Sequence, residues 1–300
     1  MDAMMVFDRA LVRRRRDRAA ATVGRVAPVL EDCADRLLDR LDDTTRRFKR
    51  ALDIGGRGVV APRLRARGVP FVVSMDLSAG MLRAGMFKAG GEALSVAGDE
   101  EFLPFAPGSF DLIVASLSLH WVNDLPGALI QIRRALAPDG LFLASLPALG
   151  TLQPLRDALG QAEATLRGGV SPRVSPFPEL RDGAGLLQRA GFALPVADLE
   201  SVALAYRTAL GLFADLRAAG EANAVLAADR RTPPRALLPM AAASLPKGPE
   251  GIDPALRLMV LTGWSPHESQ QKPARPGSAT HRLADALGTV ERKTGEKPGH

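Results

Sequence analysis

Strand-like and helix-like segments alternate between residues 50 and 146, and this alternation constrains the fold more than any other feature of the chain. Five short apolar runs are bounded by turn residues, at 50–54, 70–75, 93–96, 110–116 and 141–146. Segments with helical spacing or helix-capping residues separate most of them. This pattern predicts an α/β fold with a doubly wound, mostly parallel sheet.

The stretch 98–126 is the most informative part of the chain. Its apolar run from Phe110 to Leu119 is typical of a buried parallel strand, which we expect to end at Ser116. His120 and Trp121 follow directly. In open α/β sheets ligands bind beyond the carboxyl ends of the strands, so these two residues are candidates for the chemistry.

The segment 1–47 is expected to be helical, with a second helix at 29–41 that carries Cys33 on its apolar stripe. Cys33 is therefore predicted to be a core residue. Arg13–Arg16 and Arg18 form a basic block. Two interpretations stay open for it: a solvated helix face, or a surface that docks an acidic partner or clamps the active site.

Beyond residue 147 the pattern predicts helices at 151–167, 178–190 and 208–227 and strands at 197–206 and 256–262. These strands complete a seven-stranded sheet in a domain at 48–264. A helical insert at about 207–255 precedes the last strand, and a basic, extended tail covers 265–300. Arg217, Glu221 and Asn223 lie in the insert, either as a lid that selects the substrate or as exposed helix residues.

Composition narrows the class of protein. The formal charge of +6 comes mostly from Arg, without the aromatic and basic interleaving that binds nucleic acid. No apolar run reaches the roughly 20 residues of a membrane span. One cysteine and no secretory signal favour a reducing compartment, and we expect a cytoplasmic location. The four histidines show no metal-ligand spacing, so no metal site is predicted.

A glycine-rich turn follows the first strand, at Gly55, Gly56 and Gly58. Glycines allow a tight turn and let backbone N–H groups approach a nucleotide. Asp76 ends the second strand, at about the 20-residue distance from Asp53 that is seen in dinucleotide sites. Carboxylates after the third strand, at Asp99 and Glu100, can accept a hydrogen bond from an adenine amino group.

These motifs together resemble the class I S-adenosylmethionine-dependent methyltransferases, and most closely the type 11 group. The matching segments are 52–55, 76–78 with Met81 and Leu82, 98–99 with 103–105, 109–111 and 136–140. Segments 7–9, 13–19, 116–126 and 261–264 resemble a narrower family. That family includes a methyltransferase-like assembly factor of respiratory complex I, for which the resemblance implies hydroxylation of an arginine on a complex I subunit. Biotin-pathway methyltransferases share a less exact version of 116–126.

The resemblance implies S-adenosylmethionine as cofactor and assigns residues to it. Asp53 and Gly55 would hold the methionine end, and Gly56 and Gly58 would complete the cofactor-binding turn. The ribose would contact Asp76, within the motif that also carries Leu77 and Met81, and the adenine would contact Asp99 and Glu100. Ser116 and Leu117 would face the sulfonium. Asp76 as a plain turn residue and Asp99 as a plain loop acid remain alternatives.

One departure from the family pattern is Arg57, which stands where the methyltransferase turn has its second glycine. Its side chain could crowd the ligand, point outward, or pair with the ligand carboxylate. Crowding of the turn would leave a non-catalytic binding module that keeps the fold without the cofactor.

His120 is the candidate base, because its unperturbed pKa lies near neutrality, and a structural histidine is the alternative. Trp121 is expected either as a wall near the sulfonium or as a packed aromatic residue. Asp124 is expected to cap the next helix. The leading functional prediction is methyl transfer to a protein or small-molecule acceptor. The resemblance also implies arginine hydroxylation with a complex I subunit as partner.

Overall fold

The computed structural model describes residues 5–88, 94–271, 278 and 282–290. The chain divides into one unit at 1–267 and a second at 268–300, whose described residues include helix α10 (Leu283–Ala286). Residues 1–4, Ala93 and much of the predicted tail at 265–300 lie outside the described ranges. Within those ranges, no helix combines the length and the apolar character needed to cross a bilayer.

Seven strands form one sheet in the order β3-β2-β1-β4-β5-β7-β6, and all neighbours are parallel except the pairs made by β7. The predicted doubly wound, mostly parallel sheet is confirmed. The strands are β1 (Arg50–Ile54), β2 (Phe71–Asp76), β3 (Leu94–Ala97), β4 (Phe110–Ser116), β5 (Leu136–Pro147), β6 (Ala193–Val202) and β7 (Leu256–Trp264). The strand order reverses between β1 and β4, which is where such sheets bind ligands.

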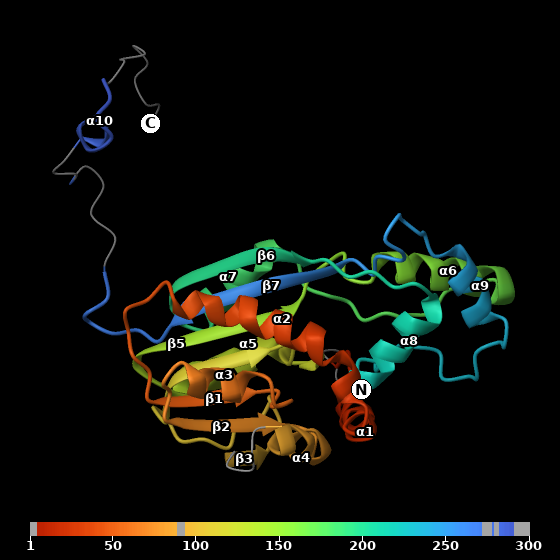
Figure 1. Cartoon of the computed structure of the whole chain (residues 1–300), viewed down its shortest axis with the longest axis horizontal. Helices are drawn as coiled ribbons and strands as arrows, with labels where there is room; N and C mark the ends of the chain where they lie inside the picture. The colour runs from red at the N-terminus through yellow and green to blue at the C-terminus, as the bar shows by residue number, and fades with distance from the viewer. Residues whose placement is uncertain (1–4, 89–93, 272–277, 279–281, 291–300) are drawn as a thin grey trace. The chain divides into compact units, whose positions relative to one another are not determined.

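Helices cover both faces of the sheet (Figure 1). One face packs on α2 (Ala27–Leu38) and α3 (Val60–Ala66), and the other on α5 (Leu125–Ala135) and α7 (Leu180–Arg189). Successive strand residues alternate between the faces, so that Ala51 lies in the α2 cluster and Leu52 in the α5 cluster. This alternation places hydrophobic side chains on both sides of every central strand.

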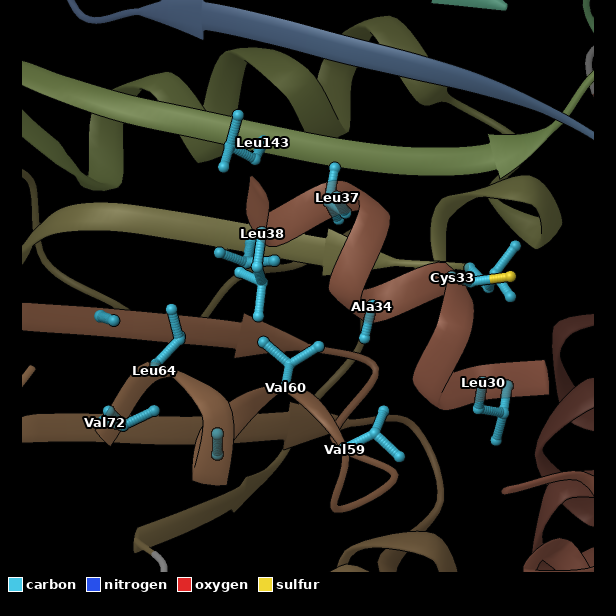
Figure 2. Packing of buried hydrophobic residues seen from close by; sticks show 14 of the residues in the cluster. Leu30, Cys33, Ala34, Leu37, Leu38, Val59, Val60, Leu64, Val72 and Leu143 are labelled. Atoms are coloured by element: carbon cyan, nitrogen blue, oxygen red, sulfur yellow. The ribbon is translucent and has the colours of Figure 1, made fainter. Parts of the chain in front are cut away.

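Cys33 lies in the apolar cluster that α2 and α3 form over the sheet, as predicted (Figure 2). Its side chain is fully buried, and burial raises the pKa of the thiol to about 12. The thiolate that a nucleophile requires is therefore disfavoured.

Two predicted helix caps are confirmed. The hydroxyl of Ser78 accepts a hydrogen bond from Met81 N at 3.0 Å, at the start of α4 (Ala79–Lys88). Asp124 Oδ1 accepts one from Gly127 N at 2.9 Å, at the start of α5. Such caps satisfy N–H groups that have no partner inside the helix.

Several boundaries differ from the expectation. The helix predicted at 208–227 ends early, as α8 (Ala209–Ala218), because the chain turns at Gly220 with φ of 80°. The strand predicted at 197–206 is β6, which begins at Ala193 and ends at Val202. β5 begins at Leu136 rather than at Leu141. The turn residues 138–140 are thus part of a strand that pairs irregularly with β4.

A helical layer lies at one end of the sheet (Figure 1). It combines α8 and α9 (Leu237–Ser244), which precede β7 as predicted, with α6 (Gln153–Arg167), which follows β5. Short 3-10 helices lie at Val23–Val26, Asp39–Leu41 and Leu119–Trp121. Helix α1 (Arg9–Ala19) begins after Asp8, whose carboxylate accepts from Leu11 N at 2.8 Å. α1 packs against α4 and thereby reaches the carboxyl ends of the strands.

Candidate functional site

The predicted cofactor residues gather at the carboxyl ends of adjacent strands. Parallel pairing sets Asp53 of β1 beside Ser74 of β2, and Asp76 ends β2 beside Ala97, which ends β3. Asp99 and Glu100 follow within three residues. The sheet register therefore brings the four predicted acidic residues to one edge, as a common ligand site requires.

The glycine-rich turn closes tightly on its neighbours. Gly55 N and Gly56 N both donate to Met75 O, at 2.7 and 3.0 Å. A Cβ at Gly55 would lie 2.5 Å from Ser118 Cβ, and Gly55 has a positive φ of 89°. Any other residue there would clash and strain the backbone. The tight turn predicted from the glycines is therefore present, and the N–H groups of Gly55 and Gly56 are paired within the protein.

Asp53 is buried with an incomplete set of partners. Its Oδ2 accepts from Ser74 Oγ at 3.2 Å, whereas Oδ1 has no hydrogen-bond partner among the described residues. Burial, supported by the nearby charge of Asp76, raises the pKa of Asp53 to about 7. A buried acceptor without a donor is typical of a site that takes a ligand group.

Asp76 and Glu100 are also buried, and here the partner is a residue of α1. Arg16 Nη1 lies 3.4 Å from Asp76 Oδ2 and 3.1 Å from Glu100 Oε1, and all three side chains are fully buried. Burial raises the pKa of Asp76 although Arg16 opposes it. Burial by itself would also raise the pKa of Glu100, but the charges of Arg16 and Arg9 outweigh burial, and the pKa of Glu100 is lowered.

The basic block therefore divides into two parts. Arg13, Arg14 and Arg18 are exposed, as a solvated face requires. Arg16 instead turns inward, and Arg9, at the start of the same helix, pairs with Asp99 and Glu100. The interpretation of the whole block as a solvated face is wrong for Arg16, because the buried acids attract its guanidinium across 60 and 84 residues of sequence.

Arg57 points into the protein rather than outward. Its side chain is 2% exposed, and Nη2 donates to Leu117 O at 2.7 Å and to Glu221 Oε1 at 3.0 Å. Within the described chain, Arg57 is not among the residues with positive φ, which in this turn are Gly55 and Gly58. Arg57, which stands in place of a glycine of the family pattern, therefore introduces no backbone strain into the turn.

Leu117 is strained, with a φ of 50° at the end of β4. Its N–H donates to Ser145 O at 2.8 Å, and its carbonyl oxygen accepts a hydrogen bond from Arg57 Nη2. Non-glycine residues seldom adopt this conformation, which is enriched at functional sites. Ser116 also ends β4, and its carbonyl lies 3.6 Å from the position of a Cβ on Gly55.

Glu221 connects three side chains beside Leu117. Its Oε2 lies 2.7 Å from His120 Nε2 and 2.6 Å from Trp121 Nε1, and its Oε1 accepts from Arg57. Burial disfavours the charge, but His120 and Arg57 outweigh burial and lower the pKa of Glu221. The expectation that Glu221 is exposed on a helix is wrong, because α8 ends at Ala218 and the chain turns Glu221 inward.

Trp121 is a packed aromatic residue in this structure. It is 3% exposed and meets Phe7 edge-on, with ring centroids 5.2 Å apart. Leu77 packs against the same cluster. Met81 is fully buried in the α2 cluster, so it supports the turn from the core rather than lining the site.

An apolar cavity of about 300 Å³ opens beside this polar group. Arg57, Leu117, His120 and Trp121 line it, together with residues mainly from α8 and the segments 173–177 and 219–223. An apolar pocket with a few convergent polar groups is the expected form of a small-ligand site. Within the described residues, no three potential metal ligands lie together.

Comparisons with known proteins agree with this geometry. Residues 52–144 match the model of a methyltransferase domain. The arginine-hydroxylase NDUFAF5 of Danio rerio is 38% identical over 94% of this chain and 89% of its own length. The human protein of that name is 37% identical over 92% and 81%. A malonyl-[acyl-carrier protein] O-methyltransferase of Methylovorus is 35% identical over 74% and 76%.

Solved structures support the fold alone. YcgJ of Bacillus subtilis has a TM-score of 0.54 at 16% identity and covers 77% of this chain and 98% of its own. A methyltransferase of Thermotoga maritima has a TM-score of 0.50 at 15% identity, over 85% of this chain and 99% of its own. The Rossmann-like methyltransferase fold is confirmed.

The cytoplasmic location expected from the sequence is wrong, since relatives that match over most of the chain are named as mitochondrial proteins. The methyltransferase domain confirms the predicted cofactor, S-adenosylmethionine. At the methionine end, Asp53 Oδ1 is an acceptor without a donor among the described residues, which fits the ammonium group of this cofactor. At the adenosyl end, Arg16 and Arg9 hold the carboxylates.

Proposed function

Because this chain belongs to the methyltransferase-like family that includes the NDUFAF5 arginine-hydroxylases, we propose that it is an S-adenosylmethionine-dependent enzyme that modifies a protein or small-molecule acceptor. Methyl transfer is the reaction that the site geometry supports best. The observation that carries this proposal is the contact between His120 and Glu221, which both line the apolar cavity.

Glu221 determines which nitrogen of His120 can accept a proton. An ionised carboxylate can only accept hydrogen bonds, so the Nε2 that lies 2.7 Å from it carries the hydrogen. In a neutral imidazole the lone pair is then on Nδ1, which is buried and has no partner in the described structure. In this tautomer His120 can take up a proton only at Nδ1, so the group that receives the methyl must reach this buried atom.

The other residues of the site position the reaction. Arg57 and Trp121 hold Glu221 in place, so that His120 keeps one orientation. The lining of the cavity is mainly apolar, which strengthens electrostatic interactions among its few polar groups. Bound S-adenosylmethionine supplies an activated methyl group with a neutral leaving group, so positioning matters more than strong acid catalysis.

Arginine hydroxylation is the second candidate, with a complex I subunit as the protein substrate. It is favoured by the extent of the match, since NDUFAF5 of Danio rerio aligns over 94% of this chain and the malonyl-[acyl-carrier protein] O-methyltransferase over 74%. The longer alignment takes in nearly the whole chain, beyond the methyltransferase domain at 52–144.

Mass spectrometry of complex I subunits from a deletion strain and its complemented parent separates the two reactions. A peptide that lacks one methylene in the deletion strain supports methyl transfer, and one that lacks a single oxygen supports hydroxylation. Complementation with Glu221→Gln serves as the control for a site-dependent effect. Identical peptides in all strains would exclude a complex I subunit as substrate.

A further inference from the structure

We infer that helix α1 competes with the adenosyl half of the cofactor for the same carboxylates, so that cofactor binding requires this helix to withdraw. The inference rests on the proposed function, because it takes the ends of β1, β2 and β3 as the cofactor site. It concerns Arg9 and Arg16, which the proposed chemistry does not use. Two sets of contacts and the unpaired donors of Arg16 support it.

Asp76 has no oxygen accessible to a ribose while α1 is in place. Its Oδ1 accepts from Ser78 N at 2.7 Å, and its Oδ2 faces Arg16 Nη1 at 3.4 Å. The side chain is fully buried. A pair of ribose hydroxyls can reach this carboxylate only after the guanidinium leaves.

The acids after β3 are occupied in the same way. Glu100 Oε1 accepts from Arg16 at 3.1 Å, and Glu100 Oε2 and Asp99 Oδ1 both accept from Arg9 Nη2. Arg9 also donates to Trp121 O at 3.3 Å. Helix α1 thus covers Asp76, which is predicted to bind the ribose, as well as Asp99 and Glu100, which are predicted to bind the adenine.

While α1 is in place, two hydrogen-bond donors of Arg16 have no partner among the described residues. Among the described residues, Nε and Nη2 of Arg16 have no hydrogen-bond partner although the side chain is fully buried. A buried donor without a partner destabilises the state that contains it. The charge of Arg16 is balanced by Asp76 and Glu100, but its hydrogen-bonding capacity is not filled. A ligand that satisfies the carboxylates can therefore replace it.

The two ends of α1 are attached to the domain by contacts outside the acids. Asn123 Oδ1 accepts from Val6 N and Phe7 N, both at 2.8 Å. At the other end, Asp17 Oδ1 accepts from Ser78 Oγ at 2.5 Å. Withdrawal of α1 thus needs the Asp17 end to separate from the start of α4, which carries Arg16 away from Asp76 and Glu100.

The Asp17 end of α1 lies close enough to α4 for an engineered disulfide that can be formed and reduced. A Cβ on Gly80 would lie 3.3 Å from Ala20 Cβ, close to the roughly 3.5–4.5 Å between the Cβ atoms of a disulfide. Gly80 lies in the first turn of α4 with an ordinary helical backbone. The double variant Ala20→Cys/Gly80→Cys therefore joins α1 to α4 when oxidised and releases it when reduced.

Calorimetry with S-adenosylhomocysteine tests the inference on the full chain. We expect the oxidised double variant to bind at least about 10-fold more weakly than the same protein after reduction. The single variant Ala20→Cys is the control, and its affinity should not respond to reduction, because Cys33 is buried. Equal affinity of the locked and released forms overturns the inference and leaves the proposed function standing.

The variant Arg16→Gln gives an independent result. It removes the competing charge, so we expect binding of S-adenosylhomocysteine to become several-fold tighter while the ligand-free protein unfolds at a lower temperature. Weaker binding would show that Arg16 belongs to the ligand site, which overturns the competition. If no form binds S-adenosylhomocysteine, including reduced protein and Arg16→Gln, the proposed function fails together with this inference.

Discussion

Single carboxylates determine how this site responds to pH and to ligands. Asp53, Asp76 and Glu100 are all buried at the strand ends, yet their pKa values are shifted in different directions. The difference arises from their partners, since Glu100 meets two guanidinium groups and Asp53 meets one hydroxyl. Burial raises the pKa of a carboxyl group, and a nearby cation lowers it.

Asp53→Asn should remove a pH dependence of stability. The folded-state pKa of about 7 lies above the ordinary value of 3.8, so the native state binds the extra proton and loses stability as pH rises between these values. Relative to the variant, the natural protein should lose about 2 kcal/mol of unfolding free energy between pH 5 and pH 8. Urea unfolding at both pH values measures this, and parallel curves would contradict it.

Cofactor affinity should rise as pH increases through about 7, because only ionised Asp53 attracts the ammonium group of the methionine moiety. Calorimetry with S-adenosylhomocysteine between pH 6 and pH 8 measures the effect. Asp53→Asn should bind more weakly and without this rise. A rise of equal size in the variant would assign the titration to another group.

Glu221→Gln should lower kcat on the order of 100-fold with a smaller change in KM, because an amide cannot hold His120 in one tautomer as an anion does. The pH profile of kcat should also shift, which a purely structural role would not produce. Exposed Glu250 provides the matched control, Glu250→Gln, for which we expect no change. An unchanged pH profile in Glu221→Gln would remove its positioning role.

At the scale of elements, α6, α8 and α9 build a separate apolar cluster that shapes the cavity. Leu155 of α6, Leu212 of α8 and Leu238 of α9 all line it. These helices come from two different connections of the sheet, after β5 and after β6. The cavity is therefore a product of their packing together rather than of the predicted insert alone.

Leu212→Ala should destabilise the protein by about 2–4 kcal/mol, because Leu212 is 2% exposed and its removal leaves a void. Leu210, in the same helix, is 73% exposed, so Leu210→Ala should change the unfolding free energy by less than about 0.5 kcal/mol. Urea unfolding compares the two variants. Equal losses would show that the cluster is not packed as described.

At the scale of the whole molecule, the unit at 1–267 contains all seven strands and the candidate site. The topology brings the ends of β1, β2, β3 and β4 to one edge and leaves β6 and β7 to carry the second connection with α8 and α9. The candidate site therefore lies within the first unit.

A chain that ends at His267 should therefore unfold at nearly the same temperature as the full chain and bind S-adenosylhomocysteine equally well. Thermal unfolding with and without the ligand measures both properties. A lower midpoint or a loss of binding would show that the segment 268–300 contributes to the fold or the site.

Local signals in the sequence were enough to predict the sheet and the edge of the sheet at which the candidate site lies. Strands such as β1 and β4 are short apolar runs, and Gly55 and Ser78 lie where a tight turn and a helix cap need them. These features depend on neighbours within a few residues. The resemblance carried by the same segments therefore predicted the fold, the family and the cofactor.

Only the tertiary structure decided the partners of the charged residues. Arg16 looks like any cation of the basic block, and Glu221 looks like any acid of a surface helix. Their partners lie 84 and 101 residues away, at Glu100 and His120. Whether a charge faces solvent or a buried counter-charge depends on how distant segments pack, and no periodicity in the sequence encodes that choice.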